Sequence, residues 1–241
     1  MSAGFLAAAE RAEPISPERL AGSGDVLVLA PHPDDETLGC GATIAALAEL
    51  GRRVQVVIVT DGAASHPASR RCPPPALARL RAREAREAVR ILGCGRLPPP
   101  LHLGIPDSAP PEDARTQDRV LALLARTLTP RTTAILTTWD GDPHPDHQWT
   151  ARLARRLSWR APEAALWAYP IWGRFTDRVP ESAQSVVRVA ARQAGARKRR
   201  ALRAHRSQMT GLIADDPDGF VMAPALQEHF LDADEVFIRW T

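Results

Sequence analysis

Cysteine, lysine and long hydrophobic runs are scarce in this 241-residue sequence, and each shortage excludes a class of protein. The three cysteines, Cys40, Cys72 and Cys94, are odd in number and lack C-x-x-C spacing, which argues against a disulfide scaffold or a thiolate zinc site. No apolar run approaches the roughly 18 residues that a membrane span requires. The N-terminal segment is also a poor secretory signal, because it lacks a basic region. These absences favour a cytoplasmic protein without a membrane span.

Lysine occurs once, at Lys198, so arginine supplies nearly all of the positive charge. The formal net charge of +3 is small for the length and permits acidic partners without requiring them. The most basic segment, residues 192–208, has helical spacing and no interleaved aromatic residues, so the stacking surfaces that single-stranded nucleic acids need are missing. We interpret this segment as a solvated helix face and predict no nucleic-acid partner.

Strands and helices are predicted to alternate along the chain. Continuous apolar runs at residues 26–30, 54–60 and 133–138 are typical of strands buried on both faces of a sheet. A helix of small residues separates the first two runs, which therefore form a β-α-β unit with parallel strands. We predict an α/β fold with a mostly parallel sheet flanked by helices, in a single domain over residues 1–241. Residues 235–240 are predicted to form its last, edge strand.

Two of these strands lead into nearly the same tetrapeptide. The first is followed by His-Pro-Asp-Asp at residues 32–35, and the strand at 133–138 by His-Pro-Asp-His at residues 144–147. Proline suits the first position of a helix, and side chains three residues apart in such a turn face the same way. Since ligands of open α/β sheets bind beyond the carboxyl ends of the strands, the histidines and the aspartate can converge on one point there.

Imidazoles combined with a carboxylate are ligands for a divalent ion such as zinc, which keeps an open position for water in catalytic sites. The alternative is that these residues are only helix caps and surface histidines. Two such tetrapeptides, each at a strand-to-helix transition, favour the metal site. No P-loop or G-x-S-x-G motif occurs, and Ile44 stands where a dinucleotide-binding loop at residues 39–44 would need a small residue. We interpret the glycines of that segment as sites of close helix–sheet packing.

Five motifs, taken in order, resemble the PIG-L/LmbE family of zinc-dependent deacetylases. They are A-P-H-P-D-D-E-T-L-G-C-G at residues 30–41, T-D-G at 60–62, R-x-x-E-x-x-x-A-x-x-x-L-G at 81–93, H-P-D-H at 144–147 and K-x-x-A-L-x-x-H-x-S-Q at 198–208. The first and fourth are the specific ones. The resemblance implies a Rossmann-like fold and removal of the acetyl group from an N-acetylated amino sugar. Residues 62–76 and those beyond 210 match no family pattern, and we expect them to shape the pocket.

The resemblance also implies roles for individual residues around the two tetrapeptides. It makes His32, Asp35 and His147 the ligands of one zinc ion per chain. It makes Asp34 the general base and His144 the residue that polarises the substrate or protonates it. Iron(II) and cobalt(II) accept similar ligands, so zinc is an expectation rather than a necessity.

Arg81 and Asp107 are the two substrate-binding residues that the resemblance implies. The predicted partner is a small molecule, an N-acetylglucosaminyl-type conjugate, and the number of subunits is left open. One alternative is a metal-dependent amidase or other hydrolase that acts on a non-sugar substrate. A more distant one is a non-catalytic protein that binds nucleic acid through its basic helix, for which a steep salt dependence of binding would be diagnostic.

Overall fold

Strands and helices alternate along the described part of the chain, which comprises residues 4–180, 186–190 and 194–240 of this computed structural model. The strands are β1 (Glu13–Ile15), β2 (Asp25–Ala30), β3 (Val54–Thr60), β4 (Leu101–Ile105), β5 (Thr132–Thr138), β6 (Ala165–Tyr169), β7 (Val186–Val189) and β8 (Glu235–Trp240). The helices are α1 (Phe5–Glu10), α2 (Pro17–Ala21), α3 (Asp35–Glu49), α4 (Pro74–Leu92), α5 (Ala114–Ala125), α6 (Pro145–Ser158), the 3-10 helix η1 (Trp172–Phe175), α7 (Gly195–Leu202), α8 (Arg206–Met209) and α9 (Pro224–Asp232). Within those ranges, no helix is both long and apolar enough to cross a membrane.

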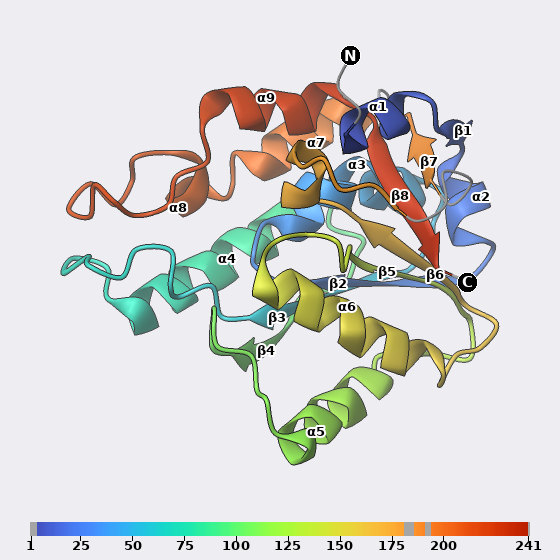
Figure 1. Ribbon diagram of the computed structural model, residues 1–241, viewed down its shortest axis with the longest axis horizontal. Coiled ribbons are helices and arrows are strands. Elements are labelled where there is room, and N and C mark those ends of the chain that lie inside the picture. The colour runs from blue at the N-terminus through green and yellow to red at the C-terminus, as the bar shows by residue number, and fades with distance from the viewer. Residues whose placement is uncertain (1–3, 181–185, 191–193, 241) are drawn as a thin grey trace.

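The described strands form one eight-stranded sheet in the order β1-β7-β8-β6-β5-β2-β3-β4 (Figure 1). Neighbouring strands are parallel except for β8, which runs antiparallel to both β6 and β7. The long strands begin and end close to the predicted bounds, because each is a continuous apolar run that needs burial on both faces. The predicted α/β, Rossmann-like fold with a mostly parallel sheet is confirmed.

Helices cover both faces of the sheet, and the side chains of β2 alternate between the two cores. Val26 and Val28 belong to the core beneath α3, α4 and α7, whereas Leu27 and Leu29 belong to the core beneath α5 and α6. Figure 1 shows α5 and α6 on one side of the sheet and α3, α4 and α7 on the other. The result is a three-layer arrangement in which the carboxyl ends of β2 and β5 open onto the starts of α3 and α6.

Helix α3 lies very close to the sheet because its residues are small. A Cβ atom on Gly39 would lie 2.2 Å from Cδ2 of Tyr169 on β6, so only glycine permits this approach. Cys40 beside it is fully buried and has no disulfide partner. The interpretation of these glycines as helix–sheet packing residues is therefore confirmed for Gly39, but it was wrong for Gly41, which faces Lys198 on α7 and Leu92 on α4.

Strand β8 lies inside the sheet, so the prediction of an edge strand at residues 235–240 was wrong. Its first residue, Glu235, is 1% exposed and its carboxylate accepts hydrogen bonds from the backbone N–H groups of Ala42 and Thr43, both at 2.8 Å. The apolar residues that follow are buried on both faces, as an interior position requires. The chain returns to place this strand between β6 and β7, an arrangement that the local pattern does not encode.

The arginine-rich segment 192–208 also differs from its prediction, since it forms two helices, α7 and α8, rather than one; residues 192–193 lie outside the described residues. Lys198 is 2% exposed, and its Nζ atom donates to the carboxylate of Glu235 at 2.8 Å. Arg197 pairs with a glutamate at the end of α3. The solvated helix face was therefore wrong for these two cations, because α3 and β8, distant in sequence, supply their partners.

Candidate metal and catalytic site

The structure brings together the seven side chains singled out in the sequence at the carboxyl edge of the sheet. They are His32, Asp34 and Asp35 after β2, Arg81 on α4, Asp107 after β4, and His144 and His147 at the start of α6. All of them line one cavity except the last histidine, which is fully buried behind it. Their roles stay predictions, and the geometry decides how well each role fits.

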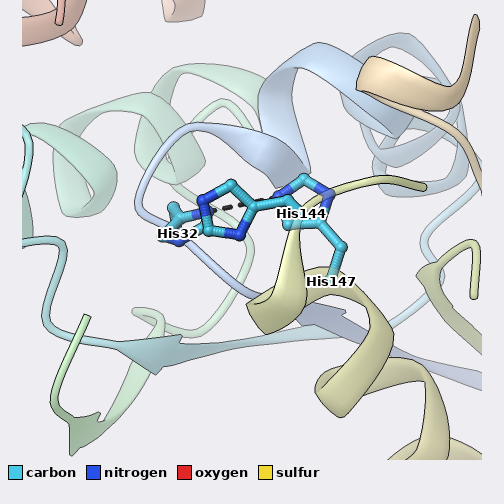
Figure 2. A group of neighbouring side chains, drawn as sticks. All are labelled: His32, His144 and His147. Atoms are coloured by element: carbon cyan, nitrogen blue, oxygen red, sulfur yellow. Dashed lines mark hydrogen bonds between the residues drawn. The ribbon is translucent and has the colours of Figure 1, made fainter. Parts of the chain in front are cut away.

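Three donor atoms of the predicted metal ligands form a nearly equilateral triangle. His32 Nδ1 lies 3.1 Å from Asp35 Oδ2, and His147 Nε2 lies 3.3 Å from each of these two atoms. Tetrahedral zinc with bonds of about 2.0–2.1 Å would separate its ligand atoms by about 3.3–3.4 Å. The triangle thus has the dimensions of one face of such a tetrahedron. The imidazole of His144 lies beside the other two in Figure 2, and each of the three offers a nitrogen within 4.8 Å of the others.

Carboxylates lie against both histidines of the triangle, on the side away from it. Nε2 of His32 lies 3.0 Å from Asp146 Oδ2, which also accepts from the backbone N–H of Ser108. Nδ1 of His147 lies 3.3 Å from Asp142 Oδ1. A proton on each of these outer nitrogens leaves the inner nitrogen as a lone-pair donor, the pattern found behind metal-ligating histidines.

The electrostatics of the triangle favour a positive charge at its centre. Burial opposes protonation, yet Asp107, Asp146 and Asp35 raise the pKa of His32 well above its usual range. Burial likewise opposes protonation of His147, but Asp35 and Asp142 outweigh it and raise the pKa of this histidine to about 9. Burial acts to raise the pKa of Asp35, but the two histidines hold it well below its usual range. In the absence of a metal, protons on the two histidines balance the negative charge of the neighbouring carboxylates. A cation bound at the triangle would balance the same charge.

Asp34 lies beside the triangle and is held by Arg81 rather than by the histidines. Its Oδ1 atom is 3.3 Å from Arg81 Nη2, and both side chains are buried. The guanidinium also donates to the backbone carbonyl of Gly62 at 2.8 Å. Gly62 has φ of +66°, and a Cβ there would lie 2.7 Å from the guanidinium, so glycine is required. Burial raises the pKa of Asp34 although Arg81 lowers it, which brings this carboxyl closer to the range of a general base.

His144 is oriented by the start of α6. It is the N-cap residue of that helix, and its Nδ1 atom accepts from the backbone N–H of Asp146 at 3.2 Å. Burial and the neighbouring His32 and His147 lower the pKa of His144. The neutral ring therefore carries its proton on Nε2, where it can act as a hydrogen-bond donor.

Asp107 contacts both His32 and the loop after β3. Its Oδ1 atom lies 3.3 Å from His32 Nε2, and Oδ2 accepts from the backbone N–H of Ala64 at 3.0 Å. Although burial opposes ionisation, the contact with His32 holds the pKa of Asp107 well below its usual range. The carboxylate is therefore ionised and largely engaged by the protein.

The cavity above these residues measures about 780 Å³, within the range of about 300–1,000 Å³ that suits small-molecule ligands. Part of its lining comes from the segments at residues 62–76 and 210–223, through Ala64, Ser65 and Pro67 in the first and Asp218, Phe220 and Met222 in the second. In Figure 1 both segments project from the same side of the molecule. The expectation that they contribute to the pocket is confirmed.

Most of the motif at residues 198–208 packs beneath the site, and its last residue reaches the cavity. His205 Nε2 lies 3.2 Å from Glu36 on α3, and the hydroxyl of Ser207 donates to Glu84 on α4 at 2.6 Å. Gln208 donates to the hydroxyl of Ser65 at 3.1 Å and lines the cavity. This motif ties α3, α4 and the loop after β3 together.

Asp142 is a site residue that sequence reasoning missed. Its Oδ2 atom accepts from the backbone N–H groups of Ile171 and Gly173, both at 3.0 Å, while Oδ1 faces His147. These contacts join α6 to the chain after β6. Its only local signal is the spacing of two residues before His144, which by itself does not distinguish an orienting carboxylate from a loop aspartate.

The fold is shared with solved structures of different activity. The N,N'-diacetylchitobiose deacetylase of Pyrococcus horikoshii, complexed with its inhibitor MPG, matches with a TM-score of 0.69 at 22% identity over 93% of this chain and 85% of that one. GalB, the 4-carboxy-2-hydroxymuconate hydratase of Pseudomonas putida KT2440, matches with a TM-score of 0.61 at 19% identity over 87% of this chain and 82% of that one. At these identities the likeness shows the fold alone, and the fold does not decide the reaction.

The similarity in sequence covers a smaller part of the chain than the similarity in fold does. "Uncharacterized deacetylase YaiS" of Escherichia coli (strain K12) is 31% identical over 127 residues, which cover 51% of this chain and 61% of that protein. The family model for PIG-L, described as GlcNAc-PI de-N-acetylase, matches residues 27–158, which is more than half of the chain and includes both histidine tetrapeptides. With the fold and the arrangement of the tetrapeptides in agreement, this chain belongs to the PIG-L family.

Proposed function

We propose that this protein is a metal-dependent deacetylase that hydrolyses the acetamide of an N-acetylated amino sugar. The observation that carries the proposal is the triangle of His32 Nδ1, Asp35 Oδ2 and His147 Nε2, with edges of 3.1–3.3 Å, beside a buried carboxylate that is not part of it. The names of the relatives, a chitobiose deacetylase and a family of GlcNAc-PI de-N-acetylases, support the choice of substrate class.

His32, Asp35 and His147 would hold the metal ion, because two neutral imidazoles and one carboxylate suit zinc or a similar divalent ion. Such an ion, when bound, acidifies a water molecule and polarises a carbonyl group. Asp146 and Asp142 keep the outer nitrogens of the two histidines protonated and so direct the inner nitrogens toward the ion.

Asp34 takes the proton from the attacking water. Its carboxylate borders the cavity, is not needed to complete the triangle, and has its pKa raised by burial, all of which suit a base that works near neutral pH. After accepting the proton, Asp34 is a neutral acid. It can then deliver that proton to the nitrogen of the leaving amine, which must be protonated for the tetrahedral intermediate to collapse.

His144 donates a hydrogen bond from Nε2 to the oxygen of the amide. The contact of Nδ1 with the Asp146 N–H fixes this tautomer, so the donor is in place before the substrate binds. Negative charge grows on the amide oxygen as the water attacks. A fixed donor at that point stabilises the transition state more than it stabilises the bound substrate.

Elemental analysis of the purified protein tests the metal first. Wild type should contain about one zinc or other transition-metal ion per chain after reconstitution, whereas His147→Ala should contain little. His102→Ala is the matched control, since His102 is an exposed histidine of strand β4 outside the cavity and should leave the metal content unchanged. Little metal in the wild-type protein would remove the proposal.

Asp34→Asn tests the base independently of the metal. We expect the metal content to stay at the wild-type level, while deacetylation of N-acetylglucosaminyl conjugates slows by at least about two orders of magnitude. Release of acetate provides the assay. An Asp34→Asn protein with nearly full activity would mean that another group accepts the proton.

A metal-dependent hydrolase of a non-sugar amide is the second candidate. It is favoured by the apolar outer wall of the cavity, where Trp172 and Phe220 offer few hydrogen-bond partners to sugar hydroxyls. A panel of N-acetylated amino sugars and simple N-acetyl amines separates the two. Turnover confined to the simple amines would favour this candidate.

A further inference from the structure

Apolar side chains form part of the cavity lining. Among them, Trp172 and Phe220 are partly exposed, whereas Leu38 and Met222 are each 1% exposed. The rings of Trp172 and Phe220 meet edge to face, with centroids 5.8 Å apart and an interplanar angle of 90°. Phe220 remains 37% exposed and its neighbour Val221 40% exposed, so this wall presents apolar surface to the solvent. Exposed apolar surface that continues a ligand cavity is typical of a recognition surface.

The loop that carries Phe220 is held in place by hydrogen bonds from the segment opposite. The backbone N–H of Phe220 donates to Ser65 O at 2.7 Å. Asp215 accepts from the backbone N–H groups of Arg70 and Arg71, both at 2.9 Å. The backbone hydrogen bonds thus fix the loop that carries Phe220 at two points. The position of the loop does not depend only on the packing of the aromatic ring. A wall positioned in advance costs a ligand little ordering entropy.

The charges around the cavity disfavour an anionic substrate. Among the described residues that line it, Arg81 is the only arginine or lysine, and it is 3% exposed and committed to Asp34 and Gly62. Asp107 and Asp218 face the same cavity. A phosphate next to the amino sugar would find no free cation among these side chains and would approach carboxylates.

Building on the proposed function, we infer that the amino sugar deacetylated here carries an uncharged apolar group, which binds against Trp172 and Phe220. An aromatic ring suits the edge-to-face pair, because a third ring can join it with the same geometry. The apolar group could reach this wall from the sugar's aglycone or from the acyl group. Trp172 and Phe220 are then specificity-determining residues, distinct from those that act on the amide.

Calorimetric binding tests the inference without relying on turnover. The ligands for the aglycone are methyl glucosaminide, phenyl glucosaminide and glucosamine 1-phosphate, none of which has an acetyl group to lose. We expect the phenyl compound to bind about tenfold more tightly than the methyl compound, and the phosphate to bind no better than the methyl compound. For the acyl group, methyl N-phenylacetylglucosaminide is compared with methyl N-acetylglucosaminide in the Asp34→Asn protein.

Phe220→Ala and Trp172→Ala should abolish the preference for the phenyl group by lowering the affinity for the phenyl compound to about that of the methyl compound. Phe175→Ala is the matched control, because Phe175 is 40% exposed, does not line the cavity and packs against His229 and Phe230. The preference should survive there. Thermal unfolding of each variant shows that the fold is retained.

The outcomes separate the inference from the proposed function. Equal affinity for methyl and phenyl compounds in both comparisons, or tighter binding of the phosphate, overturns the inference, and it does so even when acetate is released from methyl N-acetylglucosaminide. A phenyl preference that depends on Phe220, together with no acetate release from any glycoside, upholds the apolar subsite and refutes the deacetylase instead. The comparison that shows the preference identifies which part of the substrate bears the apolar group.

Discussion

Replacing Arg81 provides a test of what this buried guanidinium does. The family resemblance implies that it binds substrate, but its Nη2 atom lies 3.3 Å from Asp34 Oδ1 and its Nη1 atom donates to Gly62 O. Both charged side chains are almost fully buried. We therefore predict that Arg81 positions Asp34 and keeps it ionised, and that its loss changes the pH dependence of the reaction more than the binding of substrate.

The size of this effect follows from the buried ion pair. A neighbouring arginine lowers the pKa of a carboxyl by about 1–3 units, and each unit corresponds to about 1.36 kcal/mol. Burial already raises the pKa of Asp34, and Arg81 opposes that increase. In Arg81→Met the pKa of Asp34 should rise, so the base loses its charge at a higher pH. The acid limb of kcat/KM should move upward by at least about one pH unit, with a tenfold loss of rate for each unit on that limb.

The assay is the pH profile of kcat/KM and of kcat, with metal content as a control. Arg81→Lys retains a positive charge near Asp34 and should move the acid limb less than Arg81→Met does. It also provides a folded variant if the methionine protein is too unstable, since breaking a buried ion pair costs about 3–5 kcal/mol. An unmoved acid limb with a raised KM at every pH would refute this reasoning and restore the substrate-binding role.

Three further predictions concern the residues around the site. Asp146→Asn should weaken zinc binding by about 10–100-fold in a chelator competition, because it removes a carboxylate behind a proposed ligand histidine; unchanged affinity would mean that Asp146 serves only to hold the backbone at Ser108. Glu84→Ala should lower the free energy of unfolding in urea by about 2–4 kcal/mol, because the buried N–H and hydroxyl of Ser207 lose their acceptor. The control is Glu87→Ala on the exposed side of α4, which should change the free energy of unfolding by less than about 0.5 kcal/mol. Chelated protein should lose about 3 kcal/mol of stability as the pH rises from about 6.5 to 9, because the raised pKa of His147, about 9, stabilises the fold only while the ring is protonated. Metal-loaded protein should lack this loss, and a flat profile for the chelated form would contradict it.

The interior strands and the histidine tetrapeptides were predictable because their signals are local. The runs at 26–30 and 54–60 are apolar throughout, and that pattern requires burial on both faces wherever the strand lies. Side chains three residues apart in a helical first turn share a face, so the pairing of His32 with Asp35 follows from spacing. The place of β8 did not follow, because strand order is set by how the chain returns after α9.

The orienting contacts were beyond local reasoning for the same reason. Asp142 acts through backbone N–H groups at positions 171 and 173, and Arg81 reaches Asp34 from a helix that begins some forty residues later in the sequence. Lys198 looked like part of a solvated basic face because its partner, Glu235, comes 37 residues later in the sequence, on a different element. A sequence pattern reports the residue type, while the partner of a buried charge depends on the packing of distant elements.

The proposed catalytic residues of this site depend on local sequence, whereas its selectivity depends on contacts between segments that are distant in sequence. The proposed metal ligands and the proposed base come from short stretches at two strand ends, so the local sequence largely determines their arrangement. The part of the cavity lining that includes Phe220 depends instead on the contacts of residues 62–76 with 210–223, which involve backbone acceptors and the carboxylates of Asp215 and Asp216. Such contacts fix the path of the loops but constrain few of the side chains that they present. Two proteins with identical tetrapeptides can therefore differ at Phe220, and the choice of substrate has to be inferred from such positions rather than from the motifs.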